Sequence, residues 1–269
     1  FKIMNQSSGL YKHKARKRFG QNFLHDTHVI ASIVSAIAPA QDDHIVEIGP
    51  GQGALTAELV PYCQRLDAIE LDRDLLTLLL ASFSIHKGFH LHNQDALKTD
   101  YRELHQGKPL RVVGNLPYNI STPLILKLFE YTDIIADMHF MLQSEVVDRL
   151  TAQPHSKAWG RLGIAAQYLC RVERIIDVPP EAFDPAPKVQ SAVVKLTPKD
   201  SSKVDLAQLG RLQALVKQAF AQRRKTLRNN LKGVVSDAQL EHFGIDPAAR
   251  AETISLEQWV ALSDGIEQF

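Results

Sequence analysis

The sequence has few cysteines and no long apolar run. Only two of its 269 residues are cysteine, Cys63 and Cys170, and no Cys-x-x-Cys pair occurs. A disulfide framework is therefore not expected, and the 11 histidines show no spacing typical of metal ligands. No run of 18 apolar residues is present, which excludes a membrane-spanning helix. We expect a cytoplasmic, monomeric protein without a metal site or a membrane partner.

Net charge is also nearly absent, at +1, but the charges are unevenly distributed. Residues 1–25 contain six Lys or Arg and no acid, and residues 206–236 contain seven and no acid. Residues 237–269 hold seven acids and one Arg. Two basic blocks at opposite ends predict a polyanion site built from both, although each block alone could be a solvated face. The candidate residues of this polyanion site are Lys14, Arg16, Lys17, Arg18, Arg223, Arg224, Lys225 and Arg228.

The middle of the chain alternates short β-rich runs with helical patterns. Strands are expected over 44–48, 66–70, 89–93, 110–114 and 138–142. Helices are expected over 54–62, 73–83, 123–131 and 144–152. This alternation predicts an α/β fold with parallel strands and helices on both faces. Two later β-runs, 171–178 and 191–196, predict an antiparallel addition at one edge of the sheet.

The composition changes at 198–203, which reads as a linker, and the remainder is helical in pattern. We therefore expect a domain over 1–200 and a small helical domain over 204–269. In one continuous helix over 209–231, Arg223 would fall on the apolar side. Either that helix is interrupted or Arg223 is paired.

A glycine-rich turn follows the first of these strands. Gly49, Gly51 and Gly53 stand between a strand and a helix, where glycine permits a tight turn and close approach of a ligand. Glu70 ends the next strand, 21 residues after Gly49, and a carboxylate there can bind both hydroxyls of a ribose. Asp95 follows the third strand and suits an exocyclic adenine amine, although a helix N-cap is the simpler interpretation.

The sharpest motif is Asn115-Leu116-Pro117-Tyr118, directly after the fourth strand. The Asn115 side-chain oxygen accepts a hydrogen bond, and the segment before Pro117 can present a backbone carbonyl. Two acceptors converging on one point suit an amino group with two hydrogens. Tyr118 supplies a ring on which a base can stack.

These motifs resemble those of the ribosomal RNA adenine dimethyltransferases. Asn115–Tyr118 is similar to their acceptor motif, and Gly49, Gly51, Glu70 and Asp95 are similar to their cofactor residues. Further similar segments lie at 19–24, 139–143, 180–191 and 222–229, in the order and spacing of the family. The resemblance runs from about Arg16 to Trp259.

The resemblance implies a Rossmann-like S-adenosylmethionine methyltransferase fold with a small all-helical C-terminal domain. The implied activity is N6,N6-dimethylation of two adjacent adenosines near the 3′ end of 16S rRNA in the small ribosomal subunit. Asn22 and Leu24 belong to an N-terminal arm, residues 1–25, and would close over S-adenosylmethionine. Asn115 would contact both S-adenosylmethionine and the target adenosine. Phe183 would clamp the target base opposite Tyr118, unless it is only packed on the sheet.

Three alternatives remain open from the sequence. A dinucleotide-dependent oxidoreductase would use the same glycine turn and Glu70, but gives no reason for Asn115–Tyr118. A ribosome-assembly factor with secondary catalysis is the second alternative, and the intact cofactor and acceptor residues argue against a loss of catalysis. A large-subunit rRNA methyltransferase of the antibiotic-resistance type shares the core motifs, but the C-terminal segment favours the small-subunit enzyme.

Overall fold

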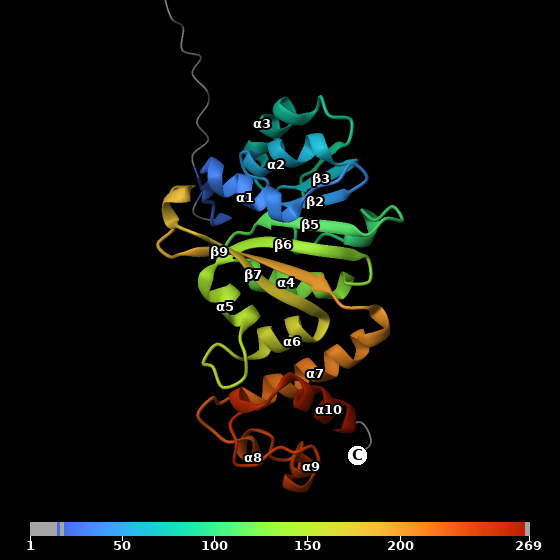
Figure 1. Ribbon diagram of the computed structural model, residues 1–269, viewed down its shortest axis with the longest axis vertical. Coiled ribbons are helices and arrows are strands. Elements are labelled where there is room, and N and C mark those ends of the chain that lie inside the picture. Colours follow the sequence, from blue (N-terminus) through green and yellow to red (C-terminus); the bar gives the residue numbers. More distant parts are fainter. Residues whose placement is uncertain (1–14, 17–18, 267–269) are drawn as a thin grey trace, which may run out of the picture.

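The computed structural model describes residues 15–16 and 19–266 and is built on a seven-stranded sheet with helices on both faces (Figure 1). The strand order is β4-β3-β2-β5-β6-β9-β7. These strands are β2 (His44–Ile48), β3 (Arg65–Ile69), β4 (Phe89–His92), β5 (Leu110–Asn115), β6 (Ile135–Gln143), β7 (Cys170–Val178) and β9 (Ser191–Pro198). The strands from β4 to β6 are parallel, and β9 is antiparallel to both of its neighbours. The α/β sheet and its antiparallel addition, both predicted from the sequence, are confirmed.

The central strands are buried on both faces, which explains their nearly continuous apolar sequences. All five residues of β2 are buried. Ile45 belongs to the hydrophobic cluster on one side of the sheet and Val46 to the cluster on the other, because successive side chains of a strand point to opposite faces.

Helices of the described chain cover both faces of the sheet. One face carries α1 (Thr27–Ile37), α2 (Ala54–Leu59) and α3 (Arg73–Phe83). The other carries α4 (Ser121–Leu128), α5 (Ser144–Thr151) and α6 (Arg161–Leu169). The sequence interpretation had assigned no element to α1 or α6. A two-stranded sheet pairs β1 (Phe23–Leu24) with β8 (Phe183–Asp184). Short 3-10 turns are Val60–Tyr62, Tyr101–Glu103, Phe129–Tyr131, Pro180–Ala182, Ser201–Lys203 and Ala251–Thr253.

The chain beyond β9 is helical and lies at one end of the molecule (Figure 1). It contains α7 (Leu206–Ala219), α8 (Leu227–Asn230), α9 (Asp237–His242) and α10 (Leu256–Ile266). A continuous helix over 209–231 is not formed, because α7 ends at Ala219. Arg223 lies in the interruption and donates to the carbonyl oxygens of Lys157 and Trp159, at 2.6 and 3.2 Å. Both options inferred for Arg223 therefore hold.

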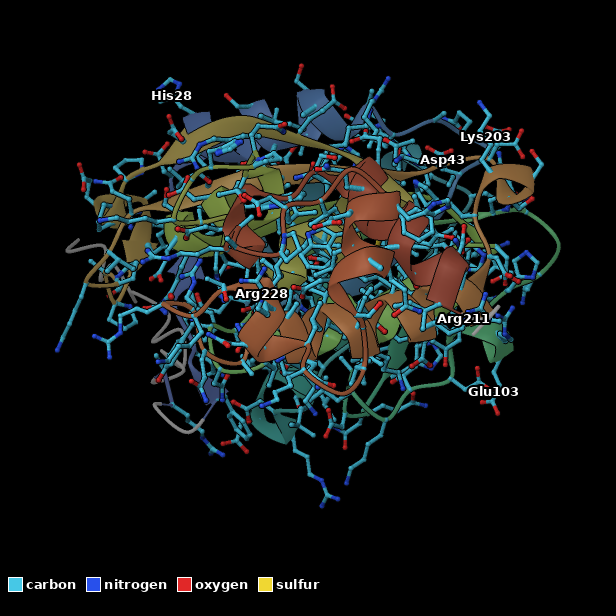
Figure 2. The ribbon with its side chains drawn as sticks, turned by 90° about the horizontal axis from the view of Figure 1, so that it is seen from below. His28, Asp43, Glu103, Lys203, Arg211 and Arg228 are labelled. Carbon is cyan, nitrogen blue, oxygen red and sulfur yellow. The ribbon has the colours of Figure 1, made fainter. Side chains whose placement is uncertain are left out.

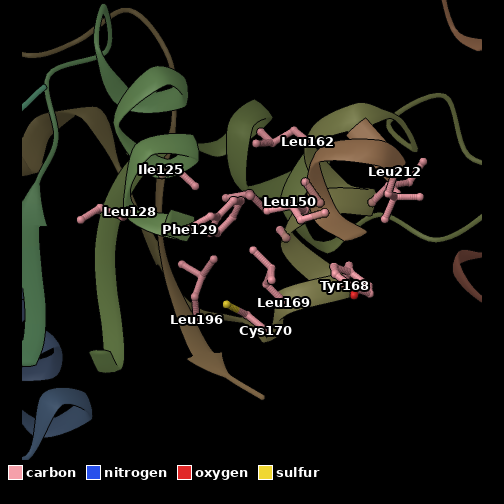
Figure 3. Packing of buried hydrophobic residues seen from close by; sticks show 14 of the residues in the cluster. Ile125, Leu128, Phe129, Leu150, Leu162, Tyr168, Leu169, Cys170, Leu196 and Leu212 are labelled. Carbon is pink, nitrogen blue, oxygen red and sulfur yellow. The ribbon is translucent and has the colours of Figure 1, made fainter. Parts of the chain in front are cut away.

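The helical C-terminal region shares one hydrophobic cluster with the sheet. Figure 3 shows Leu212 of α7 in the same cluster as Leu150 and Tyr168. Leu212 is 1% exposed, and burying such a side chain contributes about 1.5–3 kcal/mol. The Trp159 indole N–H also donates to the carbonyl oxygen of Ile254, at 2.8 Å. Among the described helices, none is both long and apolar enough to cross a membrane.

Candidate active site

A cavity of about 800 Å³ lies at the carboxyl ends of the parallel strands, which is where ligands bind in open α/β sheets. Every residue that the sequence suggested for the cofactor and the acceptor lines it. These residues are Asn22, Leu24, Gly49, Gly51, Glu70, Asp95, Asn115, Leu116, Pro117, Tyr118 and Phe183. Segments that are distant in the sequence are thus brought to one site.

The glycine turn between β2 and α2 requires glycine for two different reasons. Gly49 and Gly51 have φ angles of +67° and +60°, which L side chains rarely adopt. A Cβ on Gly51 would also lie 3.1 Å from the Phe23 ring. The backbone of the turn therefore faces the cavity, and the Phe23 ring lies against it.

Glu70 follows the last residue of β3 and lies inside the cavity, with 7% of its surface exposed. Its Oε1 accepts from the Asp72 N–H at 2.9 Å and its Oε2 accepts from the Gly51 N–H at 3.2 Å. Burial raises the pKa of Glu70, and these two hydrogen bonds act against the rise. Asn93, which the sequence interpretation missed, donates to the Glu70 carbonyl oxygen at 2.9 Å. The carboxylate is thus fixed before any ligand arrives.

A second carboxyl group, Glu47 of β2, lines the same cavity. Burial raises its pKa to about 7, and a hydrogen bond from the Thr56 hydroxyl, at 2.7 Å, lowers it in part. Glu70 adds a smaller upward contribution to the pKa of Glu47. The sequence interpretation gave Glu47 no role, although it begins the glycine motif.

Asp95 caps a turn and not a helix, and it also lines the cavity. Its Oδ1 accepts from the Leu97 N–H at 2.9 Å, so it closes a turn after β4. The side chain is only partly buried and lines the cavity. A turn residue can still present its second carboxylate oxygen to a ligand.

The acceptor motif, Asn115–Tyr118, begins at the last residue of β5 and continues as a tight turn. Asn115 Nδ2 donates to the backbone carbonyl oxygen of Asn22 at 3.0 Å. The Leu116 N–H donates to the Met141 carbonyl oxygen at 3.2 Å, and the Pro117 carbonyl oxygen accepts from Ile120 at 3.2 Å. Within the described chain, no hydrogen bond uses Asn115 Oδ1 or the Leu116 carbonyl oxygen. These are the two acceptors that the sequence suggested for an amino group.

Two aromatic side chains border the acceptor part of the cavity. Tyr118 is 57% exposed and lines the cavity from the acceptor turn. Its ring lies so near Gly20 that a Cβ there would be 2.9 Å from it. Phe183 is 5% exposed and belongs to the hydrophobic cluster beneath α1, while it also lines the cavity. Both interpretations of Phe183 are compatible with this position.

His139 of β6 is a cavity residue without an assigned role. It is 2% exposed, and neither ring nitrogen has a hydrogen-bond partner in the described part of the chain. Burial lowers its pKa to about 4, so the ring is neutral at pH 7. The described residues contain no group of three His, Cys, Asp or Glu side chains able to hold a metal ion.

The candidate RNA-contacting residues lie in different environments. Lys14, Lys17 and Arg18 lie outside the described residues. Arg16 forms ion pairs with Asp72, at 3.6 Å, and with Asp74. Arg223 donates to backbone carbonyl oxygens, and Arg228 (Figure 2) pairs with Asp237 at 2.8 Å. Arg224 and Lys225 are exposed, and no ion pair within the described chain involves them.

Comparison with known proteins agrees with the geometry of the site. The family described as "Ribosomal RNA adenine dimethylase" matches residues 12–268. The chain is 55% identical to "Ribosomal RNA small subunit methyltransferase A" of Saccharophagus degradans, over 94% of this chain and 94% of the relative. It is 52% identical to the protein of the same name from Pseudomonas aeruginosa, over 97% of this chain and 98% of the relative.

Two solved structures share the fold over nearly the whole chain. A dimethyladenosine transferase from Plasmodium falciparum has a TM-score of 0.80 at 25% identity, covering 91% of this chain and 98% of its own. The 23S rRNA methyltransferase ErmE has a TM-score of 0.72 at 27% identity, covering 92% of this chain and 100% of its own. The fold is therefore that of a Rossmann-like methyltransferase, as the sequence predicted. Matched over almost all of its length, the chain belongs to the ribosomal RNA adenine dimethylase family.

Proposed function

We propose that this protein transfers methyl groups from S-adenosylmethionine to N6 of two adjacent adenosines near the 3′ end of 16S rRNA, and thereby contributes to small-subunit biogenesis. The observation that carries the proposal is the Asn115 amide, whose nitrogen is used by Asn22 while its oxygen stays available at the cavity. A neutral acceptor at that point suits an adenine amine.

The cofactor part of the proposal rests on Glu70 and the glycine turn. A buried carboxylate held by two backbone N–H groups retains lone pairs for the ribose hydroxyls. Gly49 and Gly51 leave room for the cofactor, and Asp95 would bind its adenine. Asn22 and Leu24 would cover it from the N-terminal side. S-adenosylmethionine, when bound, supplies a methyl group on a cationic sulfur.

Asn115 and Leu116 would activate the acceptor by alignment. The exocyclic amine of adenine is a poor nucleophile because its lone pair is delocalised into the ring. Hydrogen bonds from its two N–H groups to Asn115 Oδ1 and the Leu116 carbonyl oxygen would favour tetrahedral geometry and localise the lone pair. Such alignment supplies much of the rate enhancement in reactions between two bound groups. Pro117 fixes the turn, and Tyr118 and Phe183 would stack on the flipped-out base.

RNA would be held by both ends of the chain. We assign residues 1–200 to methyl transfer and 204–269 to RNA contact, with the basic segment before residue 25 shared between cofactor and RNA. Arg224 and Lys225 are the strongest candidates in the second unit, since they are exposed. Arg223 and Arg228 would reach phosphates only by giving up or sharing their present partners. We further propose that the protein acts as a monomer in the cytoplasm.

The test is mass spectrometry of nucleosides from unmethylated small subunits incubated with the protein and S-adenosylmethionine. N6,N6-Dimethyladenosine at two adjacent positions of 16S rRNA is the expected product. Because ErmE acts on 23S rRNA, large subunits form the second arm. Methylation confined to the large subunit, or to a single methyl group, would contradict the proposal.

A further inference from the structure

The segment formed by Arg16 and residues 19–25, here called the strap, crosses the cavity and is tied down at three places. At one end, Gln21 Nε2 donates to Asp72 Oδ2 at 2.8 Å. In the middle, the Asn22 carbonyl oxygen accepts from Asn115. At the other end, the His25 N–H donates to the Ala182 carbonyl oxygen at 3.0 Å, beside the pairing of β1 with β8. The second and third ties lie at or beside residues already placed in the acceptor site, but the first reaches a residue without a role.

Asp72 is buried and makes contacts in two directions. Its side chain is 1% exposed. The carboxylate caps α3 by accepting from the Asp74 N–H at 3.1 Å, and it also accepts from Gln21. On its other side, the Asp72 N–H donates to Glu70 Oε1. One residue thus holds both the strap and the carboxylate that we assign to the ribose.

Arg16 and Gln21 complete the anchor on the strap. The Arg16 N–H donates to Gln21 Oε1 at 2.8 Å, so both ends of the Gln21 amide are used. The Arg16 guanidinium lies between Asp72 and Asp74. The buried Asp72 carboxylate thus accepts a hydrogen bond from the Gln21 amide and forms an ion pair with Arg16, both of which belong to the strap. These partners offset the free-energy cost of burying a negative charge.

We propose that Asp72 is a positioning residue for cofactor binding, which couples closure of the strap, through Gln21 and Arg16, to the placement of Glu70. The proposal rests on the function assigned to Glu70 above. Because the strap and Glu70 share one anchor, cofactor binding and strap closure favour each other, and the coupling is reciprocal. Asp72 itself touches neither substrate.

The anchor can be tested with an isosteric change of Gln21. Gln21→Glu keeps the shape of the side chain and the acceptor for the Arg16 N–H. It replaces the donor facing Asp72 Oδ2 with a carboxylate, so two acids meet at a buried position. Asp72→Asn on its own keeps one oxygen for the Asp74 N–H but turns an NH2 donor toward the Gln21 donor. When Asp72→Asn is combined with Gln21→Glu, the new amide at position 72 can donate to the new carboxylate at position 21. The hydrogen bond is then restored with its direction reversed.

The affinity for S-adenosylhomocysteine, measured by calorimetry, is the main readout. We expect Gln21→Glu to weaken it by about tenfold or more, the scale of removing a hydrogen bond to a charged group. Asp72→Asn should weaken it to a similar extent, whereas Gln21→Glu combined with Asp72→Asn should bind within about threefold of the wild type. Gln41→Glu, which adds the same charge at an exposed position, is the matched control and should change nothing.

Turnover distinguishes positioning from a structural role. With Gln21→Glu, the KM for S-adenosylmethionine should rise while kcat at saturating cofactor stays within about threefold, and the melting temperature of the free protein should be unchanged. Unchanged affinity in Gln21→Glu, or no recovery in the combined variant, would overturn the proposal. Failure of the proposed function looks different, because the wild type itself would then neither bind S-adenosylhomocysteine nor methylate small subunits.

Discussion

Asn115 donates through Nδ2 to the backbone carbonyl oxygen of Asn22, which lies 93 residues earlier in the chain. A carbonyl oxygen can only accept, so this contact fixes which end of the Asn115 amide faces the strap. The Oδ1 atom then lies on the opposite side of the amide, with the cavity available to it. The orientation of the acceptor residue is therefore decided by a backbone group of the strap.

Replacing Asn115 should affect turnover far more than cofactor binding. Asn115→Ala removes one of the two acceptors that align the adenine amine, and misalignment of reacting groups costs about 100-fold in rate. S-Adenosylhomocysteine affinity should fall by about tenfold at most, because the variant also loses the hydrogen bond to the Asn22 carbonyl oxygen. Single-turnover methylation and calorimetry measure the two quantities. A variant with full turnover would remove Asn115 from the acceptor site.

The product should be dimethyladenosine because Asn115 is neutral. After the first transfer the amine keeps only one N–H, so one of the two acceptors loses its partner. An unpaired amide oxygen in a closed pocket costs less than an unpaired ionised carboxylate. Asn115→Asp should therefore shift the product toward monomethyladenosine, as read by nucleoside mass spectrometry. An unchanged ratio of products would contradict this reason for the neutral residue.

Glu70→Ala should weaken S-adenosylhomocysteine binding by about 1.5–3 kcal/mol, the scale of hydrogen bonds to a charged group. The same affinity should fall as the pH is lowered. Burial raises the pKa of Glu70 in the free protein, whereas ribose hydroxyls would favour the ionised form, so acid protonates the site and competes with the ligand. Calorimetry at several pH values checks both effects. A pH profile that is identical in Glu70→Gln would assign the dependence to another group.

Asp67 should be a major source of stability although it lies outside the cavity. Burial alone would raise its pKa, but hydrogen bonds from His44, His92 and Arg65 outweigh burial and hold the pKa far below its ordinary value. Asp67→Asn breaks this buried cluster and should cost about 3–5 kcal/mol in urea unfolding at pH 7. Asp133→Asn, at an exposed pair with Arg102, is the control and should cost less than about 1 kcal/mol.

The contribution of Asp67 has a defined pH dependence. The folded pKa lies below the unfolded one, so the stabilisation is fully present above the unfolded value, about 3.9. It is lost as the pH falls below that value toward the folded pKa. Urea unfolding from pH 7 down to pH 3 should show a steeper acid loss for the wild type than for Asp67→Asn. Parallel curves would contradict the assignment.

Arg224 and Lys225 should contribute to the salt dependence of RNA binding. Replacing both with Gln should reduce the slope of log affinity against log salt by about 0.7–0.9 for each phosphate that the variant no longer neutralises. Cofactor affinity should not change. Arg223 is a poor choice for this experiment, because its hydrogen bonds to Lys157 and Trp159 hold the helical region to the rest of the chain. An unchanged slope with an intact fold would show that the two residues form a solvated face.

The parallel sheet and the residues around the cavity were predictable because they depend on local patterns. A buried parallel strand such as β2 reads as a continuous apolar run, and ligand-binding residues follow the ends of such strands. The sequence interpretation missed α6 because seven of its nine residues are buried, which leaves no polar face and no helical period to detect. It missed α1 because Thr, Val and Ile favour strands, although Asp26 is a good N-cap and accepts from His28 and Val29.

Other parts of the site depend on contacts that no local pattern encodes. The hydrogen bonds from Asn115 to Asn22 and from Gln21 to Asp72 join segments 93 and 51 residues apart. The ion pairs of Arg16 likewise require the position of α3. The charge pattern identified Arg16 as a candidate RNA contact, but the two acids beside it follow only from the fold.

The position of β9 between β6 and β7 constrains how the protein is made. Synthesis produces β7 (Cys170–Val178) before β9 (Ser191–Pro198), yet within the described chain β7 has no sheet neighbour other than β9. A nascent chain that has just completed β7 therefore leaves one edge of β6 and both edges of β7 without a partner strand. Open edges can pair with other chains. In the interval between the two strands this chain is therefore open to misassembly at these edges, and the arrival of β9 pairs the edge of β6 and one edge of β7.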